Sequence, residues 1–435
     1  MEHLFDEKEK DNLHKWSEYQ ALSIIGYGAY SVVWEGIHIP TKTPVAIKKQ
    51  TDIFNNLINC KRILREVILM RQLDHPSIIK LYDVFPNDSK EKFSSVYIIS
   101  ELADANLREA IKSSLYFTES QIKRIFYNLI VGLKYLKSVG VLHRDIKPDN
   151  ILLYENCDVK ICDFGLARLE TELSCPLSYH KMKRKERLKE VKKKESKEEV
   201  KSKSVVEEQL LKDLKIKAAK KPTKRKLSGH VVTRWYRAPE IILMQKNYGH
   251  AIDMWSAGCV FAELQQMRKE VVSNYCDRQP LFPGGSCYPL SPAANEEDEE
   301  ENDQLNLIFD LLGSPPSGSE MSFVEGEELI KLLLGMEKKP KVNLATLFPA
   351  TSKEAIDMLE RMLTFSPYNR LTINECLNHP YFKGVHKKEK ESFESDHIKL
   401  EFDNEEKLNE TTLRSLFQGE FDYFTKSRKE GMLFK

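Results

Sequence analysis

Hydrophobic residues alternate with polar ones near the start of the chain and then recur at helical spacing. The stretch YQALSIIGYGAYSVVWEGIHI has β-branched runs on either side of a glycine turn, and the following TPVAIKK alternates, so both predict strands. In NCKRILREVILMRQL the spacing predicts a helix, with Pro76 beyond its end and one apolar face made by Ile63, Leu64, Val67 and Ile68. A small strand-rich part with one helix is therefore expected first.

A longer helix is predicted over residues 118–140. TESQIKRIFYNLIVGLKYLKSVG opens with a Thr118/Gln121 capping box and closes near Gly140. Its apolar face is formed by Ile122, Ile125, Phe126, Leu129, Leu133 and Leu136. A strand-rich part followed by a mainly helical part predicts the α+β class.

Composition and charge narrow the function classes. The chain has 435 residues, 41% of them hydrophobic, and a formal net charge of +1, so two lobes or two domains fit and no global charge attracts nucleic acid or membranes. A charged start and the lack of a run of about 18 apolar residues indicate neither a signal peptide nor a membrane span. Eight scattered cysteines favour free thiols over disulfides or zinc. We therefore expect a soluble intracellular protein.

The first chemical signal is the glycine turn GYGAYSVV at residues 26–33. Glycines between two strands let backbone amides approach phosphates, although this pattern by itself is more often an ordinary hairpin turn. Lys48 ends VAIK on the next strand, and Glu66 on the following helix can hold that ammonium toward phosphates. Each of these residues taken alone has an equally simple interpretation as a surface charge.

Two loops carry a stronger signal, VLHRDIKPDNILL and VKICDFGLAR. Phosphoryl transfer needs a carboxylate to accept the hydroxyl proton, a cation near the transferred phosphate and oxygen ligands for Mg²⁺. Asp145 can orient the attacking hydroxyl and Lys147 can neutralise the phosphoryl group. Asn150 and Asp163 can hold the metal. The spacings match the H-R-D-x-x-x-x-N and D-F-G signatures.

These residues resemble those of eukaryotic protein kinases. The resemblance implies a bilobal α+β fold, with ATP between a five-stranded N-lobe and a helical C-lobe. TRWYRAPE is similar to the group that contains cyclin-dependent and mitogen-activated protein (MAP) kinases. DQLNLIFDLLGSP, MLTFSPYNRLTINECLNHPYF and IKLEFDNEEKLNETTLRSLFQGEFDYF resemble segments of MAP kinases.

The same resemblance implies a division of the chain. The expected parts are an N-terminal extension (1–18), a kinase domain (19–382) and a C-terminal extension that packs back on the N-lobe (383–435). Within the kinase domain we expect an N-lobe at about 19–100, a C-lobe at about 104–382, a basic insert at about 170–227 and an acidic insert at about 287–303.

Mg²⁺ and ATP are the cofactors that the resemblance implies. Glu101 and Ala103 would offer hinge backbone groups to adenine, and Ser100 would be a small gatekeeper. Ser31 replaces the third glycine of the turn, which should not prevent nucleotide binding. Glu240 with Arg370, and Asp253, resemble residues that stabilise the lower lobe and the catalytic loop. The expected ATP-binding residues are Ile25, Gly26, Gly28, Val33, Ala46, Lys48, Glu66, Ser100, Glu101, Ala103, Leu153 and Cys162, with Asn150 and Asp163 as metal ligands.

Activation is expected to depend on one serine. MAP kinases carry Thr-x-Tyr where this chain has Ser228-Gly229-His230, so dual phosphorylation on this motif is impossible. An upstream kinase is the expected partner that phosphorylates Ser228, and a constitutively ordered loop is the alternative. The resemblance implies three arginines that would receive the phosphate: Arg65, Arg144 and Arg168.

Substrate choice is implied by the next few residues. In this kinase group the carbonyl at the position of Val232 is satisfied by the arginine matching Arg237, so a substrate amide there finds no acceptor. Proline has no amide and loses nothing, which favours protein substrates with Ser-Pro or Thr-Pro sites. Arg234 and Arg237 match positions that otherwise meet a phosphotyrosine.

The charged inserts leave several interpretations open. The lysine-rich insert is typical of a solvated, partly helical or disordered segment. It could also bind acidic substrates, nucleic acid or the chain's own NEEDEEEND, or target the nucleus. We expect a cytoplasmic protein with the nucleus as a second location, no membrane partner, and no nucleic acid among the main partners. After Phe382 the chain reads KGVHKKEKE, which predicts weak binding of basic docking peptides.

Three functions are compatible with this sequence. The first is a proline-directed MAP-kinase-like enzyme that transfers phosphate from Mg-ATP in intracellular signalling. The second is a relative of cyclin-dependent kinases, although a PSTAIRE-like helix is missing. The third is a kinase-shaped scaffold, against which the intact catalytic and metal-ligand residues argue.

Overall fold

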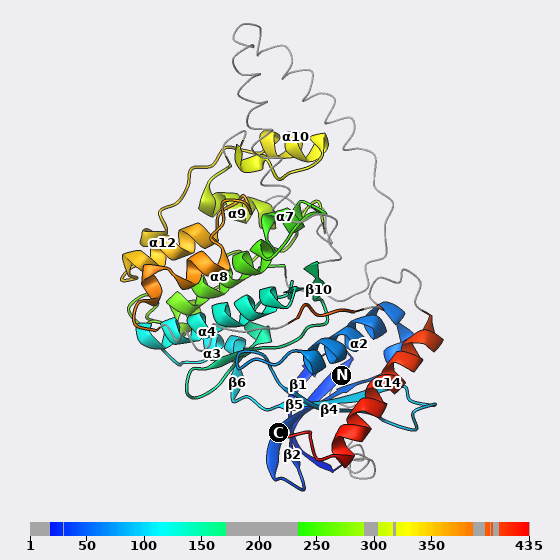
Figure 1. Cartoon of the computed structure of the whole chain (residues 1–435). Coiled ribbons are helices and arrows are strands. Elements are labelled where there is room, and N and C mark those ends of the chain that lie inside the picture. The colour runs from blue at the N-terminus through cyan, green and yellow to red at the C-terminus, as the bar shows by residue number, and fades with distance from the viewer. Residues whose placement is uncertain are drawn as a thin grey trace, which may run out of the picture.

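The computed structural model describes residues 18–28, 30–170, 234–290, 303–315, 319–385, 396–400, 402 and 409–434. A sheet-containing lobe lies beside a larger helical lobe, and the C-terminal helix, red in Figure 1, lies against the lobe that contains the sheet. This arrangement confirms the predicted α+β class.

The smaller lobe is built on a five-stranded antiparallel sheet in the order β1-β2-β3-β5-β4. Helix α2 starts where Asn56 caps the backbone amides of Ile58 and Asn59. The elements are β1 (Tyr19–Gly28), β2 (Ser31–His38), β3 (Thr43–Gln50), the 3-10 turn η1 (Ile53–Asn55), α2 (Leu57–Gln72), β4 (Leu81–Pro86) and β5 (Val96–Glu101).

The larger lobe combines helices with two small sheets, the two-stranded β10-β7 and the three-stranded β6-β8-β9. Its first part contains β6 (Ala105–Asn106), α3 (Leu107–Lys112), α4 (Glu119–Ser138), β7 (Val141–Leu142), η2 (Pro148–Asn150), β8 (Ile151–Leu153), β9 (Val159–Ile161) and β10 (Arg168–Leu169). Its second part contains α7 (Pro239–Ile242), α8 (Ala251–Gln266), η4 (Tyr275–Asp277), α9 (Gln304–Leu312), η6 (Ser319–Met321), α10 (Glu327–Gly335), α11 (Leu344–Leu347), α12 (Lys353–Met362), α13 (Ile373–Leu377) and η7 (Pro380–Phe382).

The central helices of the larger lobe agree with the hydrophobic pattern. Helix α4 is the helix predicted over residues 118–140, and Thr118 and Gln121 form its capping box. Phe126 of α4 stacks on Phe261 of α8 with ring centroids 4.3 Å apart. The predicted apolar positions of α4 are all buried: Ile122, Ile125, Phe126, Leu129, Leu133 and Leu136.

The sheet separates a small apolar cluster from the face that carries the candidate site. Val32 and Trp34 of β2 join Val45 and Ile47 of β3 in that cluster. Because successive strand residues point to opposite faces, the residues between them belong to the other face. This alternation gives the candidate site a sheet face of its own.

Helix α14 (Glu410–Lys429) fastens the chain's C-terminal part to the smaller lobe. Arg71 of α2 donates from Nε and Nη2 to the two carboxylate oxygens of Glu420, at 2.7 and 3.1 Å. Arg428 donates from Nη1 to both carboxylate oxygens of Asp83 in β4, at 2.6 and 2.7 Å. The apolar side of α14 buries Leu413, Phe417, Phe421 and Phe424.

Two further properties concern the described residues as a whole. None of their helices combines the length and apolar character needed to cross a membrane. The cysteines among them are free thiols.

Candidate active site

The register of the sheet brings the predicted nucleotide-binding residues onto one face. Val33 of β2 pairs with Gly26 of β1 and with Lys48 of β3. Ala46, two residues before Lys48, pairs with Ser100 of β5. Since residues two apart on a strand share a face, the glycine turn, the lysine and the serine border one surface.

Lys48 and Glu66 form an ion pair between the sheet and α2. The Lys48 ammonium donates to Glu66 Oε1 at 2.8 Å, and the Glu66 side chain is 8% exposed. Burial works against the charge on Lys48, but Glu66 and Asp163 raise the pKa of Lys48 above its ordinary value overall. The ammonium therefore stays charged and is held at a defined position.

The catalytic loop follows β7, and hydrogen bonds to helix α8 hold its backbone in place. Asp253 of α8 accepts the backbone amides of His143 and Arg144, at 3.0 and 2.8 Å, which is the role that the resemblance implied for it. The ring nitrogen Nε2 of His143 lies 3.0 Å from the carbonyl of Cys162. Arg144 has a positive φ of 70°. The two hydrogen bonds that the backbone amides of His143 and Arg144 donate to Asp253 help to stabilise this conformation.

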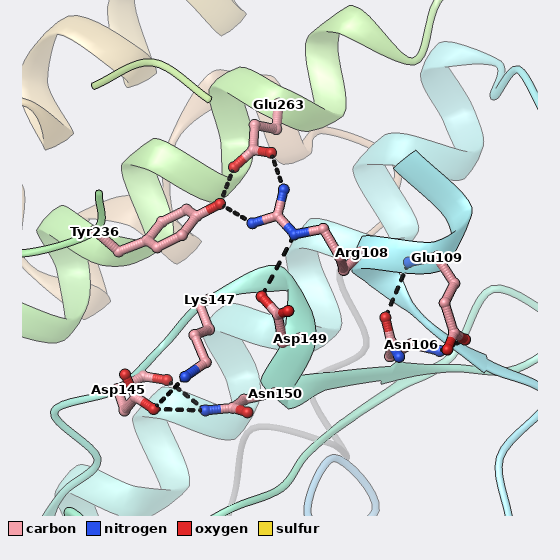
Figure 2. A network of polar contacts seen from close by, with 9 residues as sticks. All are labelled: Asn106, Arg108, Glu109, Asp145, Lys147, Asp149, Asn150, Tyr236 and Glu263. Atoms are coloured by element: carbon pink, nitrogen blue, oxygen red, sulfur yellow. Dashed lines mark hydrogen bonds and ion pairs between the residues drawn. The ribbon is translucent and has the colours of Figure 1, made fainter. Parts of the chain in front are cut away.

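Asp145 lies in a cluster with Lys147 and Asn150 (Figure 2). Lys147 Nζ donates to Asp145 Oδ2 at 2.7 Å, and Asn150 Nδ2 donates to the same oxygen at 3.0 Å and to the Asp145 carbonyl at 2.9 Å. Burial raises the pKa of Asp145 above its ordinary value, and Lys147 partly opposes this. Asp145 is thereby a better proton acceptor than a solvated aspartate, which suits a general base.

Asp163 follows β9 in a left-handed conformation, with φ of 64°. Burial alone would raise its pKa, but Lys48 and Lys147 hold the pKa of Asp163 below its ordinary value overall. An ionised carboxylate between two lysines fits a site for Mg²⁺ and phosphates, because Mg²⁺ is usually bound by one or two protein oxygens together with substrate phosphates. Asn150 uses its amide nitrogen for Asp145, which leaves its carbonyl oxygen as a second ligand.

The remaining predicted nucleotide contacts lie around this centre. Gly28 and Ile25 are exposed on β1, whereas Leu153 of β8 is buried beside Ala105, the residue with which it pairs. Ala103 is half-buried in the link between β5 and β6.

Two predicted nucleotide contacts have notable neighbours. Glu101 accepts from Lys160 Nζ at 2.6 Å, so its side chain is already paired and only its backbone is left for adenine. Cys162 directly precedes Asp163, and burial raises the pKa of its thiol well above the ordinary value.

Two of the three predicted phosphate-receiving arginines contact the segment after Asp163, and the third, Arg168, belongs to that segment. Arg65 of α2 donates to the Gly165 carbonyl at 2.8 Å, and Arg144 donates to the Leu166 carbonyl at 3.2 Å. Arg168 begins β10, which pairs with β7 next to the catalytic loop. Ser228 and Val232 lie outside the described residues, so their predicted roles stay predictions.

Beyond residue 233, the segment 234–240 is held by the carbonyls of residues 284 and 285, which precede α9. Arg234 donates to the Gly285 carbonyl, and Trp235 Nε1 donates to the Gly284 carbonyl at 3.2 Å. Burial raises the pKa of the Cys287 thiol, and the adjacent Arg237 partly opposes this. At the end of the segment, Glu240 and Arg370 form the predicted ion pair through two bonds of 2.7 and 3.0 Å.

Sequence reasoning missed one polar network beside the catalytic loop, shown in Figure 2. Arg108 of α3 contacts Asp149, Tyr236 and Glu263, which come from three separate elements. Asp149 is the residue before Asn150 in the catalytic loop. Its place in that motif was the one feature of the sequence that could have pointed to this network. The other two partners lie 128 and 155 residues away from Arg108.

Comparison with known proteins agrees with this geometry. Residues 19–182 and 217–382 match the family described as the protein kinase domain. Mitogen-activated protein kinase 5 of Oryza sativa subsp. japonica is 35% identical over 400 residues, which cover 91% of this chain and 86% of that protein. Mitogen-activated protein kinase 7 of Arabidopsis thaliana is 33% identical over 408 residues, covering 94% and 90%. Extracellular signal-regulated kinase 1 of Dictyostelium discoideum is 35% identical over 402 residues, covering 92% and 62%. The chain therefore belongs to the mitogen-activated protein kinase family of protein serine/threonine kinases.

Proposed function

We propose that this kinase transfers the γ-phosphate of Mg-ATP to serine or threonine followed by proline in protein substrates. The observation that carries the phosphoryl transfer is that Lys48, held by Glu66 at 2.8 Å, and Lys147, bonded to Asp145, both act electrostatically on the carboxylate of Asp163. A complete set of catalytic side chains argues against a scaffold function. Membership of the MAP kinase family disfavours the cyclin-dependent kinase alternative.

Each side chain has a distinct role in this proposal. Mg-ATP, when bound, supplies the phosphoryl group and neutralises charge on the phosphates. Lys48, held by Glu66, orients the α- and β-phosphates, and Asp163 and Asn150 supply oxygens to the metal. Asp145 orients the substrate hydroxyl and accepts its proton, while Lys147 stabilises the charge of the transferred group.

Selectivity for proline follows from hydrogen bonding at the next substrate residue. If the carbonyl of Val232 is satisfied from within the chain, an incoming amide loses a partner at a cost of about 1 to 3 kcal/mol. Proline has no amide and avoids that cost. The bonds of Arg234 and Trp235 to the carbonyls of Gly285 and Gly284 support this proposal, since they anchor the chain from the second residue after Val232 onward.

Phosphorylation of Ser228 is the proposed control step. A phosphoserine carries about −1.5 to −2 charges and forms charge-assisted hydrogen bonds with arginine. The convergence of Arg65 and Arg144 on residues 165 and 166 supports a phosphate site there, since a phosphate would order this segment next to Asp163. An upstream kinase is the proposed agent, because no proline follows Ser228.

The experiment that tests the reaction uses two matched peptides, one with Ser-Pro and one with Ser-Ala. Wild-type protein and Asp163→Ala are each incubated with Mg-ATP carrying a labelled γ-phosphate. We expect at least about tenfold higher kcat/KM for the Ser-Pro peptide, and no transfer by Asp163→Ala. Equal rates on the two peptides would reject proline selectivity, and no transfer to either by the phosphorylated wild type would reject the kinase activity.

Control by Ser228 is tested on the same reaction. Mass spectrometry of the wild type after treatment with an upstream kinase should find phosphate on Ser228, and Ser228→Ala should lose most of the activity. Full activity of Ser228→Ala would favour the constitutively ordered loop instead.

A further inference from the structure

Arg108 stands at an unusual place for a cation, the first turn of helix α3. The Asn106 side chain caps this helix by accepting a hydrogen bond from the Glu109 amide at 2.9 Å. The Glu109 side chain in turn accepts a hydrogen bond from the Asn106 amide at 3.1 Å. This capping box fixes the backbone on both sides of Arg108. Because the N-terminal end of a helix carries partial positive charge, a cation there is disfavoured unless other groups compensate it.

The compensation comes from three groups around the guanidinium (Figure 2). Arg108 Nη1 donates to Glu263 Oε2 at 2.9 Å, Nε donates to Asp149 Oδ2 at 3.4 Å, and Nη2 donates to the Tyr236 hydroxyl. Tyr236 in turn donates to the other carboxylate oxygen of Glu263. One guanidinium thus fills a site made of two carboxylates and a phenol.

This acidic site, made of Asp149, Glu263 and Tyr236, borders the catalytic centre. Asp149 comes two residues after Lys147, and its side chain is 46% exposed, whereas that of Glu263 is 1% exposed. Although burial lowers it, the pKa of Lys147 is raised overall by Asp145 and, to a smaller extent, by Asp149. Tyr236 belongs to the segment that the proposed function assigns to substrate recognition. A peptide whose hydroxyl reaches Asp145 therefore passes close to this site.

A site of this chemistry is suited to a basic substrate side chain. A guanidinium or ammonium is bound most tightly where two carboxylates and a further acceptor surround it. In this chain those acceptors are already used by a residue of the kinase itself. A substrate arginine would have to compete with Arg108, and the two like charges would oppose each other.

We propose that Arg108 is a specificity-determining residue that fills the acidic site from within, so that the kinase gains nothing from basic residues close to the phosphorylated serine or threonine. This inference rests on the proposed function, since it concerns how the same site selects peptides. Removal of Arg108 opens a site for a substrate arginine, and recognition then depends on Asp149.

The test compares peptides that differ in one residue. A Ser-Pro peptide with alanine elsewhere is compared with variants that carry a single arginine at each position from the fifth residue before the serine to the fourth after it, leaving the proline in place. For each enzyme the ratio of kcat/KM between the arginine and alanine peptides is measured in one preparation. A lower folded fraction changes both values equally, so it cancels in the ratio.

Three enzymes give distinct expected results. The wild-type ratio should stay within about twofold of one at every position. Arg108→Ala should raise the ratio about tenfold at one or two positions, which corresponds to about 1.4 kcal/mol of selectivity. Arg108→Ala combined with Asp149→Asn should return the ratio to near one, since the exposed carboxylate is gone. Ratios for Arg108→Ala that match the wild type at every position would overturn the inference and leave Arg108 a purely structural residue.

A binding measurement keeps the inference testable apart from catalysis. Millimolar ethylguanidinium should raise the Tm of Arg108→Ala, relative to an equal concentration of sodium chloride, because it can occupy the vacated site. It should not raise the Tm of the wild type or of the double variant. Equal changes in Tm for all three proteins would overturn the inference, even if no peptide were phosphorylated. Inactivity of the wild type toward Ser-Pro peptides would instead count against the proposed function alone.

Discussion

Replacing Arg428 by alanine should destabilise the protein in a strongly pH-dependent way. Arg428 of α14 binds both carboxylate oxygens of Asp83, at 2.6 and 2.7 Å, and Asp83 is 0% exposed. The carboxylate also accepts the Val84 amide at 2.8 Å and the Tyr19 hydroxyl at 3.2 Å. Without the guanidinium, a buried carboxylate remains with two neutral donors and no cation bonded to it.

The magnitude follows from the titration of Asp83. Burial raises the pKa of Asp83 from 3.8 to about 6, even though Arg428 acts to lower it. The folded state therefore holds the proton of Asp83 more tightly than the unfolded chain does. This proton stabilises the folded state by its full amount below pH 3.8, and the stabilisation is lost as the pH rises through about 6. In Arg428→Ala the folded-state pKa should rise further. Above that pKa the variant should lose about 3 to 5 kcal/mol, the usual cost of breaking a buried ion pair.

Urea unfolding at pH 5 and pH 8 is the suitable assay. At pH 5 Asp83 is largely protonated in both folded proteins, so Arg428→Ala should cost only about 1 to 2 kcal/mol for its lost hydrogen bonds. At pH 8 the cost should reach the larger value. Other groups that titrate in this range contribute equally to the two proteins and cancel in the difference. The control is the same substitution in an Asp83→Asn background, where the cost should be small and equal at both pH values.

One result would refute this reasoning. If Arg428→Ala lowers the free energy of unfolding by the same amount at pH 5 and pH 8, the charge on Asp83 does not control the attachment of α14. A pH dependence that persists in the Asp83→Asn background would assign the effect to another group.

Four further predictions concern separate parts of the chain. Arg370→Ala should lower the free energy of unfolding by about 3 to 5 kcal/mol in urea titrations, because it leaves the buried carboxylate of Glu240 without its cation. Asp253→Asn should lower kcat far more than it changes the KM for ATP in steady-state kinetics, because Asp253 positions the catalytic-loop backbone. Cys162 should react much more slowly with iodoacetamide at pH 8 than free cysteine does, as followed by mass spectrometry, since burial raises the pKa of its thiol. Calorimetry should find that basic docking peptides bind more weakly than micromolar, because residues 383–391 are predominantly basic.

Each of these predictions has a clear contrary outcome. An unchanged urea midpoint for Arg370→Ala would show that the buried pair adds no stability. A large rise in the KM for ATP would give Asp253→Asn a different explanation, and labelling of the half-buried Cys162 at the rate of free cysteine would contradict the raised pKa of its thiol. Low-micromolar binding of a basic peptide would falsify the charge argument.

The catalytic loop could be predicted from the sequence because its contacts are local. Asp145, Lys147 and Asn150 lie within six residues, so the motif itself brings them together, and the structure has them in direct contact. The contact of Lys48 with Glu66 was also expected. The strand that carries Lys48 is followed by the helix that carries Glu66, and side chains of two such consecutive elements can reach one another. Family resemblance implied the role of Asp253, and its bonds to the amides of His143 and Arg144 agree with that role. The hinge residues that the resemblance implied stay predictions.

The network around Arg108 could not be predicted in the same way. Its partners come from the catalytic loop, the segment 234–240 and helix α8, and only the tertiary fold brings these elements together. Nothing in the periodicity of residues 105–112 distinguishes Arg108 from an exposed helix cation. The pairing of Arg428 with Asp83 was hidden for the same reason, since the resemblance implied that the C-terminal extension packs on the N-lobe without naming the residues that attach it.

The attachment of α14 to α2 has a consequence for how the chain folds while it is being synthesised. Arg71 and Glu420 are 349 residues apart in the chain. A ribosome that adds about 5 to 20 residues per second makes α14 roughly 20 to 70 seconds after α2. During that interval the helix that carries Glu66 lacks the carboxylate that Arg71 binds in the folded protein. A newly made chain can therefore form both loops of the catalytic centre well before the helix that steadies Glu66 has been synthesised.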